Sequence, residues 1–194
     1  MEEVKYVDNV ILDKELFNLY KGLVSHNGWN LTRSSLGGDV GNFPGFIVRD
    51  NDQVYNDYWN GYFTSLYERL KISFYEKYKY KLPDLISRIH LGAKNENSMT
   101  EFHSDDNSDS TTILGFLTPV WAKDWGGSFQ VEENNVDFKP GKFLIFNSSK
   151  THNGLSSNKK IPYWRISVNY ILKNKQCCFD MLQPVWPFQF VCRK

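Results

Sequence analysis

Cysteine is scarce in this chain. The 194 residues include three cysteines, Cys177, Cys178 and Cys192, of which two are adjacent and none forms a Cys-x-x-Cys pair. An odd number of late, clustered cysteines argues against a disulfide framework and against a cysteine metal site. We therefore expect reduced thiols in a cytoplasmic protein.

Long apolar runs and an excess of charge of one sign are also missing. No apolar stretch approaches the roughly 20 residues of a membrane-spanning helix, and residues 1–5 do not begin a basic segment followed by an apolar one. We therefore expect neither a membrane anchor nor a signal peptide. The formal net charge of +1 creates no global field that would attract nucleic acid or an anionic membrane, so neither is an expected partner.

Aromatic residues are abundant, at 16% of the chain, which together with its length predicts one domain with a sizeable core. Apolar residues recur at helical spacing over 14–25, where Asp13 is the expected N-cap. A second, longer helix is expected from Asp57 to the Lys81-Leu82-Pro83-Asp84 stop. Its apolar stripe should support a sheet. The Gly- and Asn-rich residues 30–56 predict a loop with one strand at 45–49.

From Leu85 the pattern changes to short strands. Residues 85–91 alternate, with Arg88 and His90 on the face of Ile86, opposite Leu85, Ile89 and Leu91. Further strands are expected at about 111–118, 127–132, 136–138, 142–146 and 164–172. Helices followed by strands with Gly and Pro turns favour a mainly β (α+β) sandwich or jelly roll.

One motif points to metal chemistry. His103-Ser104-Asp105 is followed 49 residues later by His152, which gives the two imidazoles and one carboxylate of a 2-His-1-carboxylate iron site. Residues i and i+2 of a strand point to the same side, so His103 and Asp105 can reach one metal. His152 must then come from another strand. The acidic residues 103–109 leave a calcium loop as an alternative, although they lack the Gly and the terminal Glu of an EF-hand.

The order of these motifs resembles the iron(II)/2-oxoglutarate-dependent dioxygenases, in particular the prolyl-4-hydroxylase-like members. The resemblance covers about residues 85–172 and includes the Gly126-Gly127 pair and the Lys139-Pro140-Gly141 turn before a strand. It implies a single domain over 1–194 with a double-stranded β-helix (jelly roll, cupin-like) core at 85–172. Residues 1–84 would supply supporting helices and a loop, and the aromatic residues 173–194 would form a cap.

The resemblance also implies the roles of single residues. His103, Asp105 and His152 would bind Fe(II) and would be the catalytic residues. Arg165, 13 residues after His152, and Ser167 would bind the far carboxylate of 2-oxoglutarate, a task that suits the forked guanidinium of arginine.

Arg88 and His90 could line the same pocket, because the corresponding strand runs beside the site in the resembling family. A solvent-facing position on that strand is the alternative for both residues. Family members often have a Tyr in this region, where this chain has Arg88, His90 and a polar loop, so the remaining contacts to 2-oxoglutarate stay open.

The activity implied is hydroxylation of an unactivated C–H bond with O2, with release of succinate and CO2. The carboxylate of Asp105 favours hydroxylation over halogenation. The substrate would be a prolyl or other peptidyl residue of a peptide or protein, with a free amino acid or another small metabolite as the alternative. A non-enzymatic cupin-like metal-binding sensor, a nucleic-acid demethylase and a purely structural jelly roll are the other classes. The small net charge weakens the demethylase hypothesis.

Overall fold

The computed structural model describes residues 3–32, 43–98, 101–106 and 110–174. These residues form two antiparallel sheets and two helices. The larger sheet has eight strands in the order β1-β9-β6-β11-β5-β3-β2, with β4 paired to β3. Its strands, in chain order, are β1 (Lys5–Val7), β2 (Asn30–Thr32), β3 (Phe43–Asp50), β4 (Gln53–Val54), β5 (Leu85–Lys94), β6 (Thr111–Phe116), β9 (Phe143–Asn147) and β11 (Arg165–Lys173).

The smaller sheet has three strands in the order β10-β7-β8. They are β7 (Phe129–Val131), β8 (Asn134–Val136) and β10 (His152–Gly154), and a short 3-10 helix, η1 (Lys123–Trp125), precedes them. A core of buried apolar side chains lies between the two sheets: Leu114, Phe116, Phe129, Val131, Phe138, Leu144 and Phe146. This pair of facing sheets confirms the expected mainly β jelly-roll fold.

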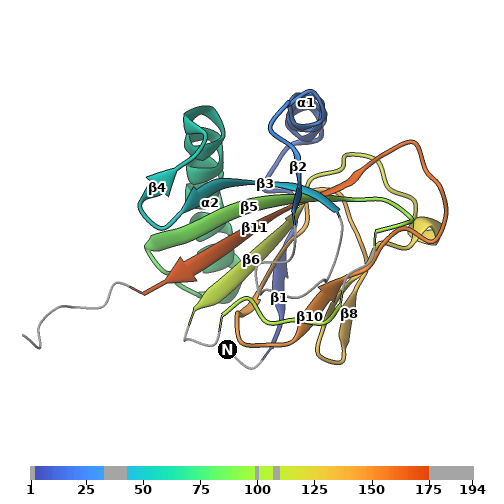
Figure 1. Ribbon diagram of the computed structural model, residues 1–194. Helices are drawn as coiled ribbons and strands as arrows, with labels where there is room; N and C mark the ends of the chain where they lie inside the picture. The colour runs from blue at the N-terminus through green and yellow to red at the C-terminus, as the bar shows by residue number, and fades with distance from the viewer. Residues whose placement is uncertain (1–2, 33–42, 99–100, 107–109, 175–194) are drawn as a thin grey trace, which may run out of the picture.

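The two helices cover the other face of the larger sheet (Figure 1). Helix α1 spans Asp13–Val24 and α2 spans Asp57–Tyr78. The expected apolar stripe of α2 is buried, and the hydroxyl of Tyr170 in β11 donates a hydrogen bond of 3.0 Å to the Phe63 carbonyl. The prediction that this helix supports the sheet from behind is therefore confirmed.

The helix N-termini differ in how they are capped. The Asn56 side chain accepts a hydrogen bond of 3.0 Å from the Trp59 amide, as an N-cap should. The prediction of Asp13 as the N-cap of α1 is wrong, because Asp13 is the first helical residue and Leu12 occupies the cap without a side-chain hydrogen bond. Asp13 instead places a negative charge in the first turn, where the helix dipole favours it.

The alternation expected over 85–91 holds only in part. The register between β5 and β11 shifts, so that Ile171 pairs with Arg88 whereas Leu172 pairs with Ile86. This bulge turns Ile86 into the apolar core that also contains Ile89 and Leu91, and it leaves Leu85 38% exposed. Ile86 therefore does not share a face with Arg88 and His90.

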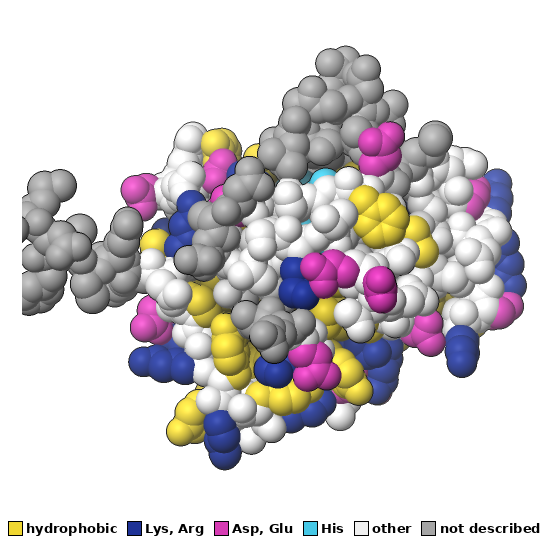
Figure 2. Space-filling view, turned by 90° about the horizontal axis from the view of Figure 1, so that it is seen from below, with side chains coloured by type: hydrophobic (Ala, Val, Ile, Leu, Met, Phe, Trp, Pro, Cys, Tyr) yellow, Lys and Arg dark blue, Asp and Glu magenta, His cyan; other side chains and the backbone are white. Residues whose placement is uncertain are grey.

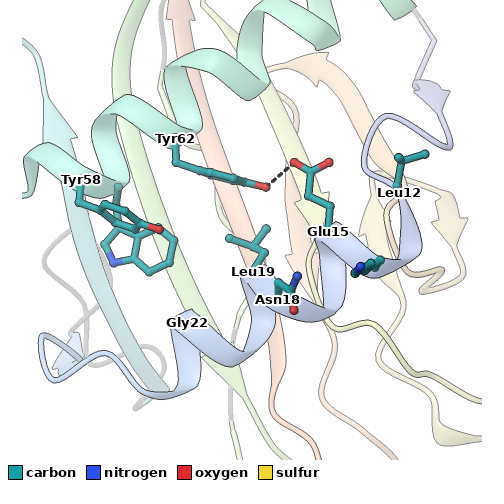
Figure 3. Close-up of a pocket in the computed structure, with 9 residues that line it drawn as sticks. Leu12, Glu15, Asn18, Leu19, Gly22, Tyr58 and Tyr62 are labelled. Atoms are coloured by element: carbon teal, nitrogen blue, oxygen red, sulfur yellow. Dashed lines mark hydrogen bonds between the residues drawn. The ribbon is translucent and has the colours of Figure 1, made fainter.

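Helices α1 and α2 enclose a pocket of about 410 Å³ (Figure 3). On its wall the Tyr62 hydroxyl donates a hydrogen bond of 2.9 Å to Glu15, which also pairs with Arg69 at 2.6 Å. The hydrogen bond from Arg69 outweighs burial and lowers the pKa of Glu15. The network therefore joins the two helices as an ionised contact.

Neither described helix is long and apolar enough to cross a membrane. All three cysteines lie outside the described residues. So does the expected aromatic cap at 173–194, apart from its first two residues, and the cap stays a prediction. The expected strand at 45–49 is confirmed as the longer β3.

Candidate metal centre

His103, Asp105 and His152 come together although 49 residues separate the two histidines. Each offers one ligand atom, and these three atoms lie within 4.8 Å of one another. Among the described residues this is the one cluster of histidine, cysteine or carboxylate side chains suited to a metal. The acidic loop considered as a calcium site reaches into 107–109, outside the described residues.

The backbone brings the two histidines side by side. His103 and His152 form an isolated antiparallel bridge, with amide-to-carbonyl hydrogen bonds of 3.0 Å and 2.8 Å. The Asp105 amide donates to the Ser148 carbonyl at 3.0 Å. His103 and Asp105 therefore lie in an extended segment rather than in a regular strand, whereas His152 begins β10 in the smaller sheet.

Hydrogen bonds fix which nitrogen of each imidazole is free to bind a metal. His103 Nδ1 lies 3.0 Å from the Glu101 carbonyl oxygen, and His152 Nδ1 lies 2.9 Å from the Lys150 carbonyl oxygen. A carbonyl can only accept, so each Nδ1 carries a proton, and Nε2 is the nitrogen that each ring can offer to a metal. Burial also lowers the pKa of His103, which favours the neutral ring. The orientation of both rings thus leaves Nε2 available to a metal.

The carboxylate of Asp105 is held from the larger sheet. Its Oδ2 accepts from the Thr112 hydroxyl at 2.8 Å and from the Asn169 amide at 3.3 Å, and it lies 3.5 Å from His152 Nε2. Burial alone would raise the pKa of Asp105, but these contacts to His152, Thr112 and Asn169 outweigh it and lower the pKa to about 2. Two imidazoles and one carboxylate are a donor set that fits Fe(II).

Arg165 begins β11 and is 1% exposed. Its Nε donates to the Gly127 carbonyl at 2.6 Å, and its guanidinium lies 5.4 Å and 5.3 Å from the ring centres of Phe116 and Phe138. No carboxylate of a described residue forms an ion pair with Arg165, and its Nη2 is buried without a hydrogen-bond partner. Burial lowers the pKa of Arg165 to about 9, which keeps it protonated at neutral pH. A buried cation with an unused donor suits an anionic ligand.

The guanidinium and the histidines lie on the same side of β10. A side chain on Gly154, two residues after His152, would place its Cβ 3.5 Å from Arg165 Nη1. Ser167, two residues after Arg165, lies on the same face of β11, is half-buried, and pairs with Gly92 of β5. The structure therefore brings Arg165 and Ser167 to the side of the sheet that faces the triad.

Arg88 and His90 lie on this face farther along β5. His90 is the register partner of Asn169, whose amide bonds to Asp105. Burial, and then the charge of Arg88, lower the pKa of His90 to about 4. Arg88 Nε lies 3.6 Å from an Asp50 carboxylate oxygen. His90 is thus placed close to the candidate centre, whereas Arg88 lies at its edge.

No sequence motif pointed to Thr112, Asn169, Gly154 or Lys94 as residues of the site. Lys94 continues the even-numbered face of β5 that carries His90, and it pairs with Arg165 in the register of β5 and β11. The spacing of four residues between His90 and Lys94 could have shown that both lie on one face of β5. The contact between Lys94 and Arg165 could not have been predicted, because it depends on the register between β5 and β11.

Little of the centre reaches the surface. In the view of Figure 2, acidic and basic side chains are both scattered over the surface. His152 is 2% exposed and His103 is half-buried. No basic patch that would suit a nucleic-acid backbone is visible in this view.

Comparisons with known proteins give a likeness in fold and not in sequence. No protein-family model and no curated protein matches the sequence. Among solved structures, a prolyl-4-hydroxylase from Pseudomonas putida matches with a TM-score of 0.59 and 14% identity, over 88% of this chain and 92% of that one.

Two further matches are structures of complexes. A prolyl hydroxylase from Trichoplax adhaerens, in complex with a hypoxia inducible factor peptide fragment, has a TM-score of 0.59 and 14% identity, over 87% of this chain and 83% of that one. A viral collagen prolyl hydroxylase from Paramecium Bursaria Chlorella virus-1, in a 2-oxoglutarate complex, has a TM-score of 0.56 and 14% identity, over 87% and 94%. The chain therefore has the fold of the 2-oxoglutarate- and Fe(II)-dependent oxygenases of the prolyl-4-hydroxylase-like type.

Proposed function

We propose that this protein is an Fe(II)- and 2-oxoglutarate-dependent oxygenase. It hydroxylates an unactivated C–H bond with O2 and releases succinate and CO2. The observation that carries the proposal is Arg165, a buried guanidinium with an unpaired Nη2 on the same side of β10 as the triad. A protein that only bound a metal would not need a buried cation there.

The triad has the chemistry that the iron requires. His103, Asp105 and His152 would hold Fe(II) on one face, which leaves other coordination positions open. When bound, the iron supplies the activation of O2 and the attack on the C–H bond. The chain itself supplies two imidazoles, an ionised carboxylate and the hydrogen bonds that orient them.

Arg165 and Ser167 would bind the distal carboxylate of 2-oxoglutarate. The guanidinium is fixed by its bond to Gly127, so its free Nη2 points to one place without further ordering. A fixed donor loses little entropy when an anion binds. This contact would set which end of the co-substrate faces the metal.

A peptidyl residue, such as a prolyl residue, is the substrate class that we propose. Support comes from the prolyl hydroxylases among the fold neighbours, one of which is in complex with a peptide fragment. Peptides assayed by succinate release test this class, and turnover of free amino acids alone would contradict it.

An anaerobic titration tests the function. Metal-free protein is titrated with Fe(II) and then with 2-oxoglutarate, and the weak visible charge-transfer band of a 2-oxo acid chelated to iron is recorded. We expect the band in the wild-type protein and its loss in His103→Ala and His152→Ala. His26→Ala is the matched control and should keep the band, because His26 packs against Phe46 and Trp59 away from the triad. Iron binding without a band would favour the sensor hypothesis, and a band in His103→Ala would refute the triad.

A further inference from the structure

Lys94 is a buried basic residue beside Arg165. It ends β5, is 7% exposed, and is the register partner of Arg165 in β11. Directly paired residues of antiparallel strands have their side chains on the same face, with Cβ atoms about 5 Å apart. The Lys94 amine donates to the Gly154 carbonyl at 2.5 Å and lies 4.9 Å from the ring centre of Phe43. The amine is therefore anchored beside Arg165.

Gly154 shows how close the two cations are. A Cβ on Gly154 would lie 3.0 Å from Lys94 Nζ and 3.5 Å from Arg165 Nη1. The two groups thus flank one point, which lies on the strand that begins with His152. A side chain on residue 154 would therefore be in contact with both groups.

We propose that Lys94 is a second cationic anchor for the distal carboxylate of 2-oxoglutarate, next to Arg165, and that this pair selects a 2-oxo dicarboxylic acid over a 2-oxo monocarboxylic acid. The proposal rests on the proposed function, because it assigns a residue to the same co-substrate site. The family resemblance implies only Arg165 and Ser167 for this carboxylate.

The two basic groups favour such a ligand. A carboxylate beside Arg165 and Lys94 favours the charged form of both groups, because it is of opposite charge. Burial, and then the charge of Arg165, lower the pKa of Lys94. A carboxylate has two oxygens, so it can accept from the guanidinium and from the amine at once. A monocarboxylic 2-oxo acid places an alkyl end beside the same two donors and offers them nothing.

The test compares two ligands in three proteins. The dissociation constants of 2-oxoglutarate and of 2-oxopentanoate, which has the same chain length without the distal carboxylate, are measured by the anaerobic band titration. Wild type, Lys94→Met and the control Lys139→Met are compared, since Lys139 is exposed and pairs with Asp8 instead. We expect Lys94→Met to bind 2-oxoglutarate tenfold to about a hundredfold more weakly, as for lost hydrogen bonds to charged groups. Its affinity for 2-oxopentanoate should be unchanged, and Lys139→Met should match wild type for both.

The outcomes separate this proposal from the proposed function. If wild type gives no band with Fe(II) and 2-oxoglutarate, the proposed function fails. If wild type gives the band and Lys94→Met binds 2-oxoglutarate as tightly, the function stands and Lys94 is not an anchor. Equal weakening of both ligands would also overturn the proposal, because it would show a structural role.

A second variant keeps the proposal testable if Lys94→Met does not fold, which circular dichroism would reveal. In Gly154→Ala the new methyl group would lie 3.0 Å from Lys94 Nζ, so the flexible amine must move while its charge remains. We expect Gly154→Ala to lose selectivity for 2-oxoglutarate over 2-oxopentanoate. Unchanged selectivity in a folded Gly154→Ala protein would contradict the proposal.

Discussion

At the scale of the residue, the candidate centre depends on side chains that orient the proposed ligands. Asp105 is the example, because its Oδ2 accepts from Thr112 of β6 and from Asn169 of β11. The Thr112 hydroxyl also lies 2.8 Å from the Ser148 hydroxyl. The larger sheet therefore fixes the carboxylate before any metal binds, which lowers the cost of forming the site.

Thr112→Val should weaken metal binding without unfolding the protein. Valine is close to threonine in shape but cannot donate to Asp105, and loss of such an orienting partner typically costs about 10- to 100-fold in metal affinity. Fe(II) affinity is measured anaerobically by competition with a chelator. Thr111→Val is the matched control, because the neighbouring residue of the same strand points to the opposite face. Equal affinity in both variants would show that the hydrogen bond does not orient the carboxylate.

The sequence predicted which residues meet at the centre but not which residues hold them. His103, Asp105 and His152 were predictable because the chemistry of the donor set and the spacing of i and i+2 are local properties. Asn169 and Lys94 were not, because each acquires its place only when β5 and β11 pair in one register. Pairing of this kind joins distant segments and is invisible in a local pattern.

At the scale of the element, the packing of β6 against β9 leaves no room for a side chain at one position of β6. Gly115 of β6 pairs with Phe143 of β9. A Cβ on Gly115 would lie 2.2 Å from a ring carbon of Phe143, which is fully buried and cannot move away freely. The glycine therefore makes room for the ring.

Gly115→Ala should destabilise the protein by about 1–3 kcal/mol, the usual cost of overpacking a core. Gly61→Ala is a control for which we expect a change of opposite sign in the free energy of unfolding. Gly61 lies in α2, is exposed, and has nothing within 4 Å of its Cβ position. Alanine there should stabilise the helix by about 0.5–1 kcal/mol. Urea denaturation gives both free energies of unfolding, and a Gly115→Ala protein as stable as wild type would contradict the overpacking.

Whether a segment forms a helix or a strand was more predictable than which face of a strand each residue occupies. The apolar stripe of α2 and the strands after Leu85 follow from periodicity, and the structure contains them. The position of Ile86 was predicted wrongly, since the bulge opposite Leu172 reverses the local alternation. A bulge is set by the partner strand, so periodicity within β5 could not reveal it.

At the scale of the whole molecule, the order of the strands brings the site together. The neighbours β6, β11 and β5 in the larger sheet lie far apart in the sequence, and β11 is the central one. It contributes Arg165, Ser167 and Asn169 to the face of the larger sheet that is turned toward the smaller sheet. The sequence predicted a jelly roll from helices followed by strands, but the order of those strands is a property of the complete fold.

Burial of His90 should make the stability of the whole protein depend on pH. Its pKa is lowered to about 4 by burial and by the charge of Arg88, whereas an unfolded chain has a histidine pKa of about 6.5. As the pH falls from about 6.5 to 4, the unfolded state takes up this proton and the folded state does not. The folded state therefore loses up to about 3 kcal/mol of stability across this window.

A comparison of metal-free wild type with His90→Gln isolates this effect. We expect the free energy of unfolding of wild type to fall more steeply than that of His90→Gln between pH 6.5 and about 4, whatever constant difference the substitution adds. Both proteins keep His103 and Asp105, so the titration of these groups cancels in the difference. Urea denaturation at several pH values measures it. Parallel pH profiles would show that His90 takes up its proton as readily in the folded protein as in the unfolded chain.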